Sequence, residues 1–423
     1  MAASPSVVEP VPSRVPPALF NVCFVLCVLN AAFFASVWLS GNWIHDKAGL
    51  GIPTDFVNVW AAGRLVLEGH PALAYDWDIQ RQIELAVLKQ DFPGYFAWHY
   101  PPPFLFVAAF LAQFPYSVAF VGWVAASLLP YLAVMRAIVG RAAFGVILAI
   151  GLPMVLSNGI AGQNGFLTAS LIGGTLYLLP TRKILSGICL GLLTYKPQYG
   201  FLFPIVLIAA TEWTVFFSAA ATAIALAFVS WLAFGTDSWL AFFHWMPRFS
   251  QDFLVAGKVP WWKMQSLFSM VRYLGGSEQL AWACHWILTA AVVATLVAMW
   301  RSRLRYSLKA AALATGALLS TPYLFMYDMV VLAIPVAWLM RIGLSRGFRA
   351  YELPALAAAA ALALAYVFTG IPLGLSATLI VAALIGARCR HGREHSGRPA
   401  AAVTQAEIPA LPALTVPKRR RAF

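Results

Sequence analysis

Residues 184–235 read ILSGICLGLLTYKPQYGFLFPIVLIAATEWTVFFSAAATAIALAFVSWLAFG, and this stretch decides the class of fold. It holds three apolar runs, over 184–195, 198–211 and 214–235, and its only charged residues are Lys196 and Glu212. Apolar runs of about this length are typical of helices that cross a lipid bilayer, where ~20 residues span the hydrocarbon core. We therefore predict that the chain crosses a membrane several times in succession.

The rest of the chain has the same character. Its 423 residues are 61% hydrophobic and 11% charged, with a mean hydropathy of +0.76. Soluble domains carry about 25% charged residues, so this chain has too few charges to cover a water-facing surface of its size. Further apolar runs cover residues 18–40, 116–138, 142–157, 164–181, 281–300, 308–320, 329–342, 351–369 and 371–387. The sequence predicts an all-α polytopic membrane protein with about 12 transmembrane helices, within a range of about 11–13.

The basic residues predict how the chain is threaded. The net charge is +13 and the isoelectric point about 9.7, but the Lys and Arg residues stand in short clusters between apolar runs, so we expect no nucleic-acid partner. With the N-terminus inside and about 12 crossings, every such cluster falls on the cytoplasmic side, as the positive-inside rule requires. The long segments 41–100 and 236–280 then lie outside. This arrangement predicts a multi-pass protein of the bacterial inner membrane, with membrane lipids as partners and its function on the extracytoplasmic face.

Residues 101–114 leave two topologies open. They begin with Pro101-Pro102-Pro103, and their length of about 14 residues suits a re-entrant or interfacial helix better than a span. If they crossed the membrane, the later basic clusters would lie outside. We prefer the topology in which they do not cross.

The chain divides into one membrane domain and two tails. Residues 1–17 are rich in proline and predict a disordered cytoplasmic N-terminus. Residues 18–387 form a single transmembrane domain whose first apolar run is expected to be retained rather than cleaved. Residues 388–423 are strongly basic and predict a disordered cytoplasmic tail near anionic headgroups. The five cysteines suit apolar packing, because no zinc-site spacing accompanies them.

The first long polar segment contains GIPTDFVNVWAAGR at residues 51–64. Thr54 or Asp55 could cap a helix that begins here, with apolar residues following at helical spacing. A helix of this length and mixture of faces would lie flat on the membrane. Local sequence alone favours a simple capping role for Asp55.

The tripeptide Asp76-Trp77-Asp78 has two interpretations. It looks like the Asp-x-Asp metal motif of transferases that use nucleotide sugars. It also fits the capping of a helix that continues through Ile79, and we favour this interpretation. No metal and no cofactor are expected.

Several separated segments together resemble glycosyltransferase family 87, which belongs to the GT-C class of membrane transferases. Each segment is weak alone, but they occur in a specific order between about residues 50 and 335. They are Asp55-Phe56 through Gly63, Leu67-Glu68-Gly69-His70-Pro71 through Asp76, Tyr100-Pro101-Pro102, Gly162-Gln163-Asn164, Lys196-Pro197-Gln198, and Thr321-Pro322-Tyr323 through Asp328.

This resemblance implies a GT-C-like fold with interfacial helices in the first extracytoplasmic loop. It implies transfer of a hexose, with mannose the first expectation, from a polyprenyl-phosphate sugar to a glycolipid or lipid-linked glycan acceptor. An acidic residue of the first loop is the catalytic base in such enzymes, and Asp55 is the matching position. An inverting transfer needs one base to take the proton of the acceptor hydroxyl. It also needs cations or hydrogen-bond donors to hold the leaving phosphate.

The substrate-binding candidates come from the same segments and from the cations of the loops. They are Arg64, His99, Tyr100, Gln163, Asn164, Lys196, Gln198, Lys263, Tyr327 and Asp328. Lys196 stands out because a cation inside an apolar hairpin is costly and marks a functional site, although it could instead snorkel to the interface. His99 could equally be a satisfied interfacial histidine. Gln163 and Asn164 could merely satisfy backbone groups, and the aromatic residues of 236–280 could form an anchoring belt.

Two other functions remain open. A transporter or flippase of a lipid-linked sugar would place polar residues near the membrane midplane and show paired repeats. The sequence shows no convincing repeat, and its polar residues gather at one face. A non-catalytic scaffold would not explain the ordered polar turns.

Overall fold

The computed structural model describes residues 14–396, with side chains through Arg390, and this part of the chain is helical. Among these residues the only β-structure is two isolated bridges. Six helical segments are long and apolar enough to cross a membrane. They are Pro17–Leu39 (α1), Tyr116–Val139 (α5), Trp213–Val255 (α12, Trp213–Ser250, with the turn after it), Glu278–Arg301 (α14), Met326–Arg346 (η6 and α16, Ala333–Arg346) and Glu352–Thr369 (α17). The prediction of a polytopic all-α membrane protein is confirmed.

A bent pair of helices makes a seventh possible span. Helices α6 (Ala142–Gly151) and α7 (Met154–Ala161) meet at 70° across a break of a few residues, at Leu152-Pro153. Proline has no backbone N–H to donate, so a helix commonly breaks or kinks where it stands.

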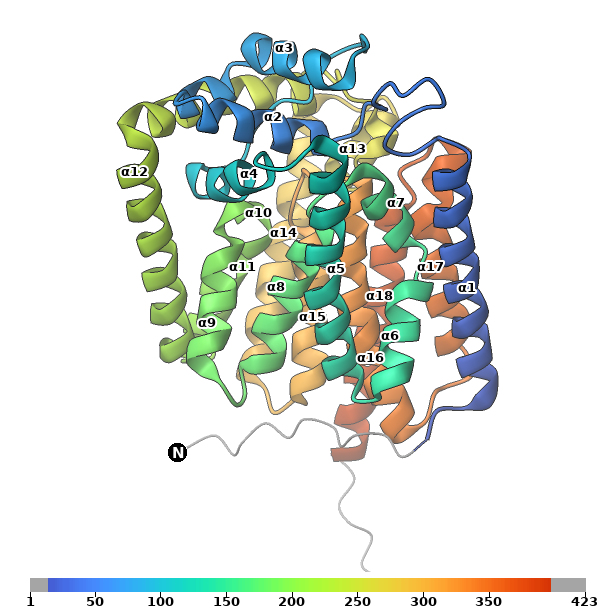
Figure 1. Ribbon diagram of the computed structural model, residues 1–423. Coiled ribbons are helices and arrows are strands. Elements are labelled where there is room, and N and C mark those ends of the chain that lie inside the picture. The colour runs from blue at the N-terminus through green and yellow to red at the C-terminus, as the bar shows by residue number, and fades with distance from the viewer. Residues whose placement is uncertain (1–13, 397–423) are drawn as a thin grey trace, which may run out of the picture.

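Five further helices lie alongside these segments in the same bundle (Figure 1). Four of them are too short to qualify as spans by length: α8 (Gly165–Leu178), α9 (Lys183–Leu192), α11 (Leu202–Ala209) and α15 (Tyr306–Leu319). The fifth, α18 (Gly374–Ser396), is long but ends in a basic segment. Each coincides with an apolar run of the sequence. Whether all of them cross the membrane, for a total of twelve, stays a prediction.

Glycines allow two of these helices to pack closely. Gly187 and Gly191 lie four residues apart on α9 and face Ser218 and Thr222 on α12. A Cβ atom on either glycine would overlap the serine or threonine side chain opposite. Small residues at this spacing are what brings membrane helices together, since lipid offers no hydrophobic driving force for their association.

Short helices cover one end of the bundle (Figure 1). They are α2 (Phe56–Leu67), η1 (Pro71–Tyr75), α3 (Trp77–Leu88) and α4 (Leu105–Leu111). Gly63 of α2 packs so tightly on the backbone of α4 that a Cβ atom there would overlap the Ala108 carbonyl oxygen. Because α4 has seven residues, it extends only ~11 Å, far less than the ~30 Å of a hydrocarbon core. Even with the 3-10 turn before it (η2, Pro102–Phe104) this segment is too short to qualify as a span by length, and that it does not cross the membrane stays a prediction.

The segment 236–280, expected as a polar loop, is largely helical. Helix α12 continues through a kink at Gly235, whose φ of +75° is open to glycine, and reaches Ser250. A π-helical turn (η4, Gln251–Val255), a 3-10 turn (η5, Trp261–Lys263) and α13 (Leu267–Tyr273) follow. In Figure 1 the part of α12 after the kink bends over the end of the bundle, toward α2.

The predicted C-terminal tail begins later than residue 388. Helix α18 extends to Ser396, and within it the Arg388 guanidinium forms an ion pair with Glu352 at the start of α17. The remainder of the predicted tail and residues 1–13 lie outside the described residues.

Candidate active site

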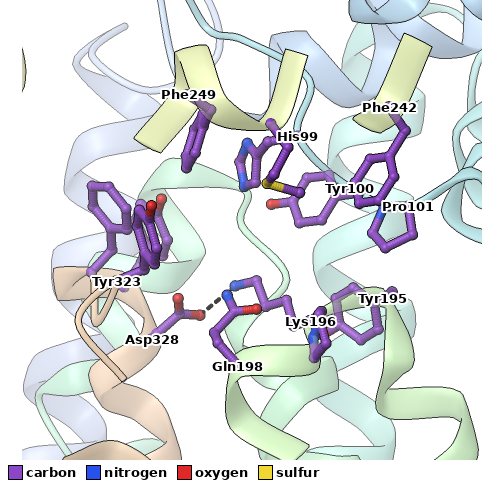
Figure 2. Close-up of a pocket in the computed structure, with 14 residues that line it drawn as sticks. His99, Tyr100, Pro101, Tyr195, Lys196, Gln198, Phe242, Phe249, Tyr323 and Asp328 are labelled. Atoms are coloured by element: carbon purple, nitrogen blue, oxygen red, sulfur yellow. Dashed lines mark hydrogen bonds and ion pairs between the residues drawn. The ribbon is translucent and has the colours of Figure 1, made fainter. Parts of the chain in front are cut away.

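A cavity of about 220 Å³, lined mainly by aromatic rings around one buried ion pair, lies where the bundle meets the short helices that cover its end (Figure 2). Four segments far apart in the sequence enclose it. They are residues 99–101, residues 195–198, the part of α12 after its kink, and residues 323–328. Figure 2 shows aromatic rings along the upper wall and a buried ion pair at the base.

The ion pair joins two residues that are 132 positions apart. Lys196 Nζ donates to Asp328 Oδ1 at 2.7 Å, and the residues are 3% and 1% exposed. Lys196 lies at the break between η3 (Leu193–Tyr195) and α10 (Pro197–Gly200), where Pro197 begins the new helix. Buried charges must be paired, so each residue holds the other in place. An ammonium has three N–H donors, and the remaining two stay available to a ligand.

Asp55 stands at the start of α2, but its side chain makes no capping hydrogen bond. The local expectation of a simple helix cap is therefore wrong for this residue. Burial raises the pKa of the Asp55 carboxyl, while the nearby Gln163 side chain and the charges of Lys263 and Lys196 oppose the shift. A carboxylate with a raised pKa and a neighbouring cation has the properties of a general base.

Two buried amides lie near Asp55 and the cavity residue Tyr100, although neither they nor Asp55 are among the residues that line the cavity. Gln163 and Asn164 stand at the junction of α7 and α8 and are 3% and 1% exposed. The Tyr100 hydroxyl donates to Gln163 Oε1 at 3.1 Å. Within the described residues, neither polar side-chain atom of Asn164 has a hydrogen-bond partner. Buried polar groups are normally paired, so these amides are suited to bind the hydroxyl groups of a ligand.

His99 forms part of the upper wall. Its ring stacks on Phe249 of α12 at a centroid distance of 4.5 Å. The Nδ1 atom lies 3.0 Å from the Ala97 carbonyl oxygen, and since a carbonyl only accepts, Nδ1 carries the proton. Burial lowers the His99 pKa to about 4, so the ring is neutral near pH 7. Its Nε2 atom is then an acceptor.

Of the remaining candidates, two line the cavity, one acts on Asp55 through its charge, and one lies away from the site. Gln198 and Tyr327 line the cavity, and the charge of Lys263 acts on Asp55. Arg64 lies on the exposed side of α2, where it forms an ion pair with Glu68 at 3.2 Å. It is not among the residues that line the cavity.

The other loop cations also have partners elsewhere. Arg248 lies over the rings of Trp77 and Trp245, at 4.8 and 4.9 Å from their centroids. Lys258 pairs with Asp252 at 2.9 Å. Of Arg64, Lys196, Arg248, Lys258 and Lys263, the two whose charge acts on Asp55 are Lys196 and Lys263.

The capping interpretation of Asp76-Trp77-Asp78 is confirmed. Asp76 Oδ1 accepts hydrogen bonds from the backbone N–H groups of Asp78 and Ile79, at 3.0 and 3.1 Å. The Asp78 carboxylate accepts from the Tyr95 hydroxyl. Within residues 14–396, no cluster of three or more His, Cys, Asp or Glu side chains is placed to hold a metal ion.

Sequence reasoning missed buried polar residues where α3 packs against α2. Gln80 Nε2 donates to the Asn58 carbonyl at 3.0 Å, and Glu84 follows one turn later on α3. Glu84 is 1% exposed, and its Oε1 has no hydrogen-bond partner among the described residues. Burial raises the Glu84 pKa to about 8. No local signal marks this residue, because its position on an amphipathic helix suggests solvent exposure.

Sequence reasoning also missed most of the aromatic wall. Phe242 and Phe249 come from the aromatic segment that was expected to anchor the protein at the interface, and Tyr323 comes from a short turn. The kink at Gly235, which turns these phenylalanines over the cavity, shows in the sequence as a single glycine.

The fold defines a multi-pass helical membrane protein, with an aromatic-lined cavity around a buried ion pair at one end of its helices. A family model described as "Glycosyltransferase family 87" matches residues 98–325, and the chain belongs to this family. It is a membrane glycosyltransferase. The match includes the cavity segments at 99–101, 195–198 and 323–325 and begins after Asp55. Comparisons with curated proteins and with solved structures find no significant match.

Proposed function

We propose that this glycosyltransferase moves a hexose from a polyprenyl-phosphate sugar to a lipid or envelope-glycan acceptor, with Asp55 as the general base. The observation that carries the proposal is the arrangement of charges. A half-buried carboxylate without a capping role lies in the field of Lys196 and Lys263, and Lys196 lines a cavity together with aromatic rings and the amide of Gln198. In such a site one group, Asp55, can accept the proton, and a different group, Lys196, can bind the phosphate.

The proposed reaction uses these groups in one displacement. The acceptor hydroxyl oxygen attacks the anomeric carbon while Asp55 takes its proton. The bond between that carbon and the phosphate oxygen breaks on the opposite side, so the configuration inverts. Lys196 holds the departing polyprenyl phosphate through the N–H groups that Asp328 does not use. A phosphate is a good leaving group without a strong acid, so the neutral His99 need only accept a hydrogen bond from the sugar.

The proposed orientation places this cavity on the extracytoplasmic face of a bacterial inner membrane. The basic turns that follow α5, α8, α14 and α16 lie at the opposite end of the bundle, which supports a cytoplasmic position for that end. All twelve helices of the bundle would cross the membrane, with α2 and α3 lying at its outer interface. Mannose is the first donor sugar to test.

The test is sugar transfer in proteoliposomes with purified protein. Polyprenyl-phosphate mannose and polyprenyl-phosphate glucose serve as donors, and total envelope lipid serves as acceptor. We expect transfer by the unsubstituted protein and a 10²- to 10⁴-fold loss in Asp55→Asn, the range typical of a lost general base. Arg64→Gln is the matched control, because Arg64 lies on the same helix in a half-exposed ion pair.

Two outcomes would contradict the proposal. Equal transfer by Asp55→Asn would exclude Asp55 as the base, and Asp328→Asn would be the next variant to measure. Movement of a fluorescent polyprenyl-phosphate sugar between leaflets, without transfer to any acceptor, would favour the flippase alternative.

A further inference from the structure

A second and larger cavity lies at the opposite end of the molecule. It has a volume of about 460 Å³, within the range of about 300–1,000 Å³ that ligand pockets occupy. It is a groove over α15, bounded by α14 and α18, since α15 packs against both of these helices. The turn between α14 and α15 and the end of α18 lie at the lower end in Figure 1, opposite α2 and α3.

The interior of the groove is apolar. Its walls are Leu, Ile, Val, Ala and Met side chains, with two threonines. Both threonine hydroxyls are already used, because Thr295 Oγ1 donates to the Ala291 carbonyl and Thr315 Oγ1 to the Ala311 carbonyl. A molecule bound along the groove therefore contacts hydrocarbon side chains, and its polar groups would receive no hydrogen bond from these two hydroxyls.

One end of the groove is basic. Arg390 and Leu304 line it there, and the exposed side chains of Arg301 and Arg303 lie close to Leu304 in the sequence, at the end of α14 and in the turn after it. No acidic residue lines the groove. The nearby Arg388 is already paired with Glu352 and Lys309 Nζ donates to the Trp300 and Ser302 carbonyls, so these two cations are occupied. The exposed arginines are suited to an anion that sits at the headgroup level.

The length of the groove matches one leaflet. Its lining on α14 runs from Leu288 to Met299 and on α18 from Leu379 to Arg390. Eleven residues of helix extend ~17 Å, about half of the ~30 Å hydrocarbon core. The groove thus begins at the basic end and stops near the midplane. A donor whose phosphate occupies the polar cavity would enter from the other leaflet.

We propose that this groove binds one acyl chain of an anionic phospholipid from the leaflet opposite the active site, with the headgroup phosphate on Arg390, Arg301 and Arg303. Lipid tails are as apolar as the groove, so hydrocarbon burial supplies little selectivity. The charge of the headgroup supplies it instead, because each Lys or Arg near an anionic lipid surface strengthens binding about fivefold.

The test is photo-labelling of the full protein in nanodiscs. Phosphatidylglycerol and phosphatidylcholine, each carrying a diazirine in the same acyl chain, are compared as probes, and the labelled peptides are mapped by mass spectrometry. We expect phosphatidylglycerol to label the groove-facing residues of α14, α15 and α18 several-fold more strongly than phosphatidylcholine. Arg390→Gln should lower this preference about fivefold.

Two neighbouring alanines provide a matched pair of variants. Ala291 lines the groove, and Ala290 is exposed on the same helix outside it. Ala291→Trp should reduce the groove labelling at least tenfold, and Ala290→Trp should leave it unchanged. If Ala291→Trp does not fold, Gly386→Leu replaces it as the groove-filling variant. Gly386 lines the groove, and a Cβ atom there meets nothing within 4 Å, so the larger side chain should be accommodated. Equal labelling by both lipids, or labelling that survives the folded groove-filling variant, would overturn the proposal.

Discussion

Replacing Lys196 by methionine should lower the free energy of unfolding by far more than the loss of a single contact would. The ammonium lies 2.7 Å from Asp328 Oδ1, and the two side chains are only 4% and 2% exposed. At an effective dielectric constant of about 20, two unit charges at this separation attract by about 6 kcal/mol before desolvation is subtracted. Removal of one partner leaves the other charge buried and uncompensated, which costs about 3–5 kcal/mol of unfolding free energy.

The double variant tests this reasoning. Lys196→Met together with Asp328→Leu removes both charges, so the cost should fall to near zero instead of doubling. Unfolding can be followed in detergent micelles by the fluorescence of the 16 tryptophans. The control is Lys183→Met, which breaks the more exposed Lys183–Glu212 pair, of similar length at 2.8 Å, and should cost less than about 1 kcal/mol.

Additive losses in the double variant would refute the argument, because they would mean that each residue is stabilised by groups other than its partner. A single-variant cost as small as that of Lys183→Met would refute it as well. Both variants that lack the Lys196 ammonium should lose sugar transfer if Lys196 holds the phosphate.

Three further predictions concern the covered end of the bundle. Asp55→Glu, which keeps a carboxylate, should retain more transfer than Asp55→Asn, while Arg64→Gln keeps full transfer in the same proteoliposome assay. Glu84 has a pKa of about 8 against 4.5 for the free group, so the folded state keeps a proton that the unfolded state loses, and stability falls as pH rises through this window. Glu84→Gln removes that loss, and its unfolding free energy relative to the unsubstituted protein should rise by about 4 kcal/mol between pH 4.5 and 8; no change with pH would contradict the assignment. Gly63→Ala should cost about 1–3 kcal/mol by forcing α2 away from α4, whereas Gly122→Ala, with open space around its Cβ, should be neutral in the same unfolding measurement.

Much of the membrane architecture follows from the sequence alone, because hydropathy is a local property. In lipid every backbone polar group must be satisfied within the segment, so a long apolar run has little choice but to form a helix. The run at 116–138 became α5 and the run at 281–300 became α14, with ends shifted by a few residues. The capping role of Asp76 is equally local, since its partners are two and three residues away.

The candidate site was predictable only in part. Lys196 and Asp328 each stand out in the sequence as charges at the edges of apolar runs, but nothing local says that they pair across 132 positions. Glu84 carries no sequence signal at all, since its burial depends on how α3 docks onto α2.

The sequence by itself determined that this chain is a helical membrane protein and which of its turns carry polar residues. Only the tertiary structure decided that the Asp55 side chain does not cap α2, that α12 bends at Gly235 to close the cavity, and that Arg64 pairs with Glu68 away from the cavity. The physical reason is the distance along the chain over which each kind of interaction acts. Hydropathy and capping act within a few residues, whereas a reaction site is made by charges and rings that meet only when distant helices pack.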